Sequence, residues 1–88
     1  MHRIVYTITD ANGIHARPAG KLVAEAKKYQ ANIRLILPVK DRSADAKRLF
    51  AVMGLGVKQG DTIHVEAEGA DAAEALSAIE AMLTESGL

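Results

Sequence analysis

The segment from residue 13 to residue 20 combines side chains that suit phosphate chemistry: it has the sequence GIHARPAG. The imidazole of His15 is a nucleophile near neutral pH, and the guanidinium of Arg17 can bind phosphate oxygens through paired N–H groups. If a helix begins here, its unpaired backbone N–H groups and the positive end of its dipole also favour an anion. These residue types leave two alternatives for His15: it carries a phosphoryl group, or it only caps the helix.

The other two histidines are weaker candidates for chemistry. His2 lies at the N-terminus, and His64 falls at an outward position of a strand pattern, where a solvated side chain is expected. The chain contains no cysteine, and no spacing such as H-E-x-x-H is present. We therefore expect no metal site and no cofactor.

The composition predicts one small domain spanning residues 1–88. The chain is 49% hydrophobic, which supplies one modest core. The absence of cysteine excludes a disulfide framework and favours the cytoplasm. Residues 1–20 lack the apolar core of a signal peptide, and no apolar run is long enough for a membrane span, so we expect no membrane insertion.

The formal net charge of the chain is zero, because it has 11 Lys and Arg residues and 11 Asp and Glu residues. This balance argues against nucleic-acid binding, and the outward strand positions hold no aromatic residue for stacking on bases. The distribution is uneven, however, since basic residues gather in the segment 15–48 and the last third is acidic. This asymmetry indicates a partly basic face for an acidic partner, although solvated charges without a partner remain the alternative.

Apolar residues alternate in three segments, which predicts strands over residues 3–9, 32–37 and 62–68. Residues 39–43 fit either a short edge strand or a loop. A helical stripe of Ala19, Leu22, Val23 and Ala26 predicts a helix over residues 16–28, in which Pro18 is tolerated within the first turn.

Two further helices are predicted from cap residues. Ser43 or Asp45 would cap a short helix that ends at Met53, before Gly54 and Gly56. Asp71 with Glu74 would form a capping-box-like pair at the start of the last helix. The order β-α-β-(β)-α-β-α predicts an α+β open-faced sandwich, with a four-stranded antiparallel sheet and all three helices on one face.

Three motifs resemble the HPr family, the histidine phosphocarriers of the phosphoenolpyruvate–sugar phosphotransferase system. The sequence GIHARPA after a strand is similar to the family's active-site signature, KRLFAVMGLG at residues 47–56 to its second helix, and residues 60–70 to its fourth strand and following turn. The resemblance covers nearly the whole chain. It implies a carrier protein within a relay rather than a turnover enzyme.

The resemblance also implies roles for individual residues. Enzyme I would phosphorylate His15 on Nδ1, and His15 would donate to EIIA-type domains. Arg17 would hold phosphate oxygens, Ala16 and Arg17 would offer backbone N–H groups, and Pro18 would fix the turn. The protein would act as a monomer. The residues that would form the surface for partner docking are Gly20, Lys21, Lys27, Arg48, Leu49, Phe50 and Met53.

One position departs from the family pattern. Many HPr proteins have a regulatory serine at the start of the second helix, but Arg48 occupies that position here. Ser43 lies earlier, in a 38–46 segment that is longer than expected, so we assign no regulatory serine. A regulatory HPr-like protein, of the nitrogen-type branch or a protein-binding paralogue, therefore remains an alternative to a sugar-transport carrier.

Overall fold

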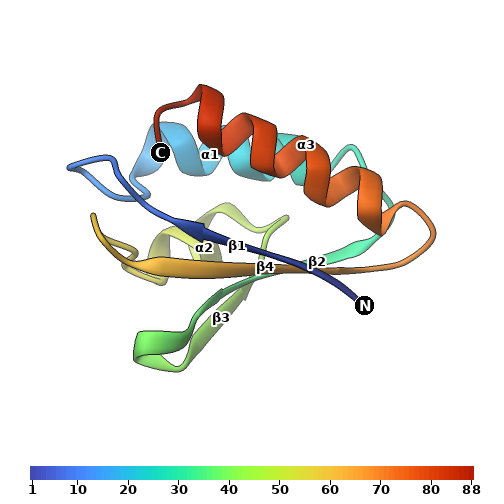
Figure 1. The fold of residues 1–88 in the computed structure, drawn as a ribbon, viewed down its shortest axis with the longest axis horizontal. Coiled ribbons are helices and arrows are strands. Elements are labelled where there is room, and N and C mark those ends of the chain that lie inside the picture. The colour runs from blue at the N-terminus through green and yellow to red at the C-terminus, as the bar shows by residue number, and fades with distance from the viewer.

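Four antiparallel strands form one sheet in the order β1-β4-β2-β3, and the helices cover one of its faces (Figure 1). The computed structural model describes all residues from Met1 to Leu88. Its elements, in chain order, are β1 (His2–Thr7), α1 (Ala16–Ala26), β2 (Asn32–Leu37), the 3-10 turn η1 (Pro38–Lys40), β3 (Arg42–Asp45), α2 (Leu49–Gly54), β4 (Thr62–Glu68) and α3 (Ala72–Glu85). The predicted α+β sandwich is confirmed.

The central strand β4 shows why the sheet has one covered face. Its residues Ile63, Val65 and Ala67 are buried beneath the helices, whereas His64 and Glu66 point to the opposite side and remain partly exposed. This alternation follows from the two-residue period of a strand, so a strand with one apolar face must lie between a core and solvent. The strands expected at 32–37 and 62–68 are confirmed residue for residue.

The two longer helices complete the core by burying their apolar stripes. In α1, Ala19, Leu22, Val23 and Ala26 are buried, as the spacing predicts. Helix α3 runs across β1 and β4 and packs against α1. Helix α1 ends at Ala26, two residues before the expected end at Lys28. Strand β1 begins at His2 and ends at Thr7 instead of spanning residues 3–9, although Ile8, which follows it, is buried.

The prediction for the second helix was wrong at its start. Ser43 and Asp45 lie in the edge strand β3, and the N-cap of α2 is Arg48. The Asp45 side chain instead accepts the Lys47 backbone N–H at 2.9 Å, and Ala46 N donates to Ile33 O at 2.9 Å. Because the segment before Arg48 still pairs with the sheet, the helix cannot begin earlier.

The predicted capping box at Asp71 was also wrong. Asp71 occupies the N-cap position of α3, but its side chain makes no bond to that helix. Its carboxylate accepts the backbone N–H groups of Gln30 and Ala31, each at 2.8 Å. These hydrogen bonds, from Gln30 first, hold the pKa of the Asp71 carboxyl below its usual value. Asp71 therefore fastens the turn between α1 and β2 to the start of α3.

Candidate functional site

His15 occupies the N-cap of α1 without capping it through its side chain. Its backbone is extended, with φ −98° and ψ −172°, and the imidazole makes no hydrogen bond to the helix. The side chain keeps 43% of its surface exposed, and its Nε2 lies 3.9 Å from Oδ2 of Asp10. The alternative in which the His15 side chain caps the helix is therefore wrong, and the imidazole remains partly exposed to solvent.

The first turn of α1 leaves backbone donors beside this imidazole. Ala19 N donates to His15 O at 3.0 Å, which is the first bond of the helix. Pro18 has no N–H, so the groups of Ala16 and Arg17 are the ones without an acceptor in the helix. The Arg17 side chain is exposed and takes part in no ion pair of the chain. Together these groups can receive an anion next to His15.

The chain before His15 is held in place by the loop that follows α2. Gly13 has φ +63°, and a Cβ built on it would overlap Val57 O and lie 2.8 Å from Lys58 Cα. Ile14 is buried, and its N–H donates to Val57 O at 3.1 Å. Only glycine fits this close approach with a left-handed backbone. The turn that presents His15 is thus fixed to residues 57–58.

The site lies in a hollow formed by three parts of the chain. Its lining comes from the loop after β1, from the first turns of α1 and from the end of α3, and consists of Asp10, His15, Arg17, Pro18, Lys21 and Ser86. Apart from the small ring of Pro18, every side chain in this lining carries a polar or charged group. The hollow is therefore polar, as expected for a site that receives a charged group from solvent.

Helix α2 presents an exposed apolar surface. Phe50 is 84% exposed, while Leu49 and Met53 are 37% and 36% exposed, and Val52 on the other side of the helix is buried. These three side chains therefore lie outside the hydrophobic core. Helix α2 packs against α1 and β3, so it belongs to the same helical layer as α1.

The charged residues assigned to docking are exposed as well. Lys21 is exposed on α1 and Gly20 beside it in the sequence is half-buried, while Lys27 is exposed at the C-cap of α1 and Arg48 at the N-cap of α2. Ser43 faces the open side of the sheet instead, opposite Ile36, where its Oγ accepts a hydrogen bond from the Arg34 guanidinium. The structure thus gives Ser43 no place on the α2 surface.

Asp10 is a residue of this site that the sequence did not indicate as functional. The run Asp-Ala-Asn-Gly at residues 10–13 is typical of a turn, and that signal describes Asp10 correctly. Its position beside the imidazole follows from the fold of the loop, and no spacing in the sequence encodes it.

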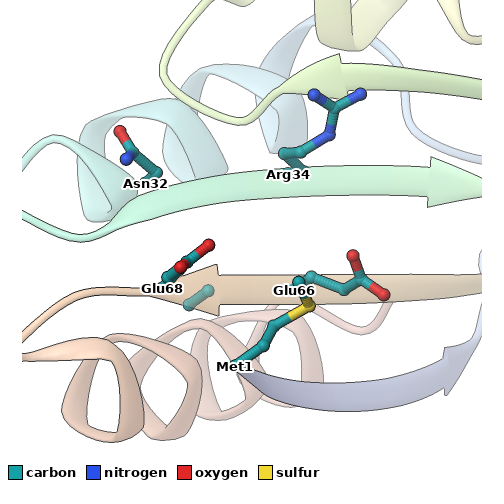
Figure 2. A pocket seen from close by; sticks show the side chains of 6 residues that line it. Met1, Asn32, Arg34, Glu66 and Glu68 are labelled. Carbon is teal, nitrogen blue, oxygen red and sulfur yellow. The ribbon is translucent and has the colours of Figure 1, made fainter.

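A second hollow, on the open face of the sheet, does not have the features of a reaction site. Figure 2 shows it between β2 and β4, with Arg34, Glu66 and Glu68 around it and Met1 at one end. Glu66 is already paired with Arg3, and Arg34 with Ser43. No group of three or more His, Cys, Asp or Glu in the structure could hold a metal ion, and no helix is long and apolar enough to cross a membrane.

Comparison with known proteins identifies the family of this chain. The family model described as the phosphorylation site of the PTS HPr component matches residues 3–85. The chain belongs to the HPr family. It is 41% identical to phosphocarrier protein HPr of Mycoplasma pneumoniae over 83 residues, which is 94% of this chain and 93% of that one. HPr of Lysinibacillus sphaericus is 40% identical over the same length, with 94% and 92% covered.

Solved HPr structures share the fold closely. The histidine-containing phosphocarrier protein of Mycoplasma superposes with a TM-score of 0.95 at 34% identity, covering 99% of this chain and 97% of that one. HPr of Bacillus anthracis gives 0.83 at 32% identity, with 92% and 94% covered. A multiphosphoryl transfer protein of Vibrio cholerae is 43% identical over 79 residues, which is 89% of this chain but 20% of that protein.

Proposed function

We propose that this HPr-family chain accepts a phosphoryl group from phospho-enzyme I on Nδ1 of His15 and passes it to EIIA-type domains. The observation that supports this most directly is the free imidazole at the start of α1, beside unpaired N–H groups and the Arg17 guanidinium. In this role the chain is a carrier that is phosphorylated and dephosphorylated in turn. The proposal treats residues 1–88 as one domain acting as a monomer in the cytoplasm.

The proposed transfer uses the imidazole of His15 and the exposed donors of the first turn of α1. The lone pair of Nδ1 attacks phosphorus, a new N–P bond forms, and the bond to the donor breaks, with its electron pair returning to the donor. The N–H groups of Ala16 and Arg17 and the Arg17 side chain stabilise the negative oxygens. An exposed helix start contributes ~1 kcal/mol or less, which is weak enough for the group to be passed on.

The exposed apolar surface of α2 supplies the partner contact in this proposal. Phe50 is the most exposed large side chain of the group formed by Leu49, Phe50 and Met53, so it would insert into a partner's surface. Exposed basic residues on α1 and at the helix caps would attract acidic residues around that surface; they include Lys21, Lys27 and Arg48. The same docking surface would serve enzyme I and EIIA-type domains, because both must reach the same histidine.

The relay itself is the feature that separates a carrier from a regulatory relative. Chain labelled with ³²P on His15 is separated from enzyme I and mixed with an excess of an EIIA domain. A carrier loses the label to that domain, and the phosphorylated chain does so faster than its spontaneous hydrolysis. If the label stays on the chain until it hydrolyses, with every EIIA domain tried, the proposed function is wrong and the regulatory alternative is favoured.

A further inference from the structure

Asp10 is held rigidly next to His15 by its own turn. Its Oδ1 accepts the Asn12 backbone N–H at 2.8 Å, and its carbonyl oxygen accepts Gly13 N–H at 3.0 Å. Its side chain is only 26% exposed, and its second oxygen, Oδ2, is the atom that lies 3.9 Å from His15 Nε2. One carboxylate oxygen therefore fixes the loop while the other faces the imidazole.

The carboxylate lies at the nitrogen that does not react. A neutral imidazole bears one proton, and a nearby acceptor at one nitrogen favours the tautomer protonated there. A carboxylate at Nε2 thus favours the Nε2–H form, which leaves the lone pair on Nδ1. At 3.9 Å the two atoms are too far apart for a hydrogen bond in this structure. Catalytic hydrogen bonds are often long before the reacting partner is bound and shorten in the complex, so this separation is compatible with the role.

We propose that Asp10 is a positioning residue that selects the reactive tautomer of His15 and stabilises the ring during transfer; this rests on the proposed function. As Nδ1 forms its bond to phosphorus, the ring becomes positively charged while the proton stays on Nε2. The donor takes the electron pair of the bond that breaks. The Asp10 carboxylate attracts that positive charge. Arg17 and Lys21, which line the same hollow, offset the repulsion between this carboxylate and the negative oxygens of the incoming phosphoryl group.

The substitution Asp10→Asn tests the role of the charge while keeping the turn. Asparagine retains the oxygen that accepts Asn12 N–H, but it presents an NH₂ donor to Nε2 in place of an acceptor. The expected result is a shift of the neutral ring toward the Nδ1–H tautomer, measured by ¹⁵N NMR of His15. Phosphorylation by phospho-enzyme I should slow about fivefold, which corresponds to one charge contact at this distance in water.

Two further variants keep the test decisive. Asp45→Asn is the matched control, because Asp45 makes the same side-chain bond to a backbone N–H two residues later and lies in β3; it should change neither the tautomer nor the rate. Asp10→Ser keeps an acceptor for the turn, replaces Asp10→Asn if that variant fails to fold, and should also reduce the Nε2–H population.

The two proposals fail in different ways. An unchanged tautomer and an unchanged transfer rate in folded Asp10→Asn or Asp10→Ser would overturn the role of Asp10 and leave the carrier function intact. The tautomer is measured on unphosphorylated protein, so it reports on Asp10 even if enzyme I transfers nothing to the wild type, a result that would overturn the proposed function instead.

Discussion

The carboxylate of Asp71 and the backbone N–H of Ala31 are joined by a hydrogen bond of 2.8 Å, which links the start of α3 to the start of β2. The nearby Gly69 lies so close that an added Cβ would be 2.9 Å from Ala31 Cα. This junction lies at the end of α1 opposite His15 and ties the turn between α1 and β2 to the start of α3 (Figure 1).

The first prediction concerns the pH dependence of stability at this junction. Hydrogen bonds from Gln30 and then Ala31 lower the pKa of Asp71 in the folded chain. A lowered folded pKa stabilises the fold above the carboxyl's ordinary pKa of 3.8, and this stabilisation is lost as the pH falls through the folded pKa. Asp71→Asn should therefore be less stable than the wild type at pH 7, and the difference should shrink as the pH is lowered below about 4.

Urea unfolding across this pH range measures the effect. Glu74→Gln is the control, since Glu74 is exposed in the first turn of α3 and makes no hydrogen bond through its side chain. A stability difference between Asp71→Asn and the wild type that stays constant from neutral to acidic pH would contradict the assignment.

The second prediction concerns the support of the His15 turn. Gly13→Ala places a methyl group against Val57 O in a left-handed backbone, so it should cost at least about 2 kcal/mol of unfolding free energy. Gly60→Ala is the control, because Gly60 also has a positive φ, +89°, but no atom within 4 Å of the added Cβ. Equal losses in the two variants, measured by thermal unfolding, would show that the contact with residues 57–58 is unimportant.

Periodic patterns made most of the fold predictable from the sequence. The strands at 32–37 and 62–68 and the buried stripe of α1 follow from the regular spacing of apolar residues. Any strand or helix that buries one face needs such spacing, so it can be recognised without the tertiary structure. Asp45 and Asp71 were misassigned because their side chains accept backbone N–H groups in turns, one local and one distant. Cap propensity cannot distinguish an N-cap from a turn, because it says that a side chain can accept a backbone N–H but not which N–H it accepts.

The residues of the site also differ in whether the sequence predicted them. His15 and Arg17 were recognisable because a histidine and an arginine at a helix start suit phosphate, and because the surrounding residues resemble the family motif. The exposure of Leu49, Phe50 and Met53 was harder to predict from spacing alone, because apolar residues on a short helix usually pack inward. The place of Asp10 in the site could not be predicted from the sequence, since its approach to His15 depends on how the loop after β1 folds.

The third prediction separates docking from stability on α2. Phe50→Ser should leave unfolding free energy within about 0.5 kcal/mol of the wild type, because the ring is exposed. It should weaken association with enzyme I by about 2 kcal/mol, roughly thirtyfold, if Phe50 is the central contact. Val39→Ser is matched to it, since Val39 is also exposed but lies in η1. Equal binding constants for the two variants by titration calorimetry would exclude the α2 surface as the docking site.

The fourth prediction concerns the arginine beside the reactive ring. Arg17→Ala should fold normally, because the side chain is exposed and unpaired, but it should slow phosphoryl transfer by about ten- to a hundredfold through loss of charged hydrogen bonds to phosphate oxygens. Arg42→Ala removes an exposed arginine of β3 and should transfer normally. Rapid-quench kinetics that give the same rate for both variants would show that the Arg17 guanidinium plays no part.

The most direct test of the central claim is the uptake of phosphate by wild type and His15→Ala from phosphoenolpyruvate, Mg²⁺ and enzyme I. His2 and His64 remain in the variant as internal controls. The wild type should gain one phosphate that is labile in acid and stable in base, and His15→Ala should gain none. No uptake by the wild type, or equal uptake by His15→Ala, would contradict the assignment of His15 as the phosphoryl acceptor.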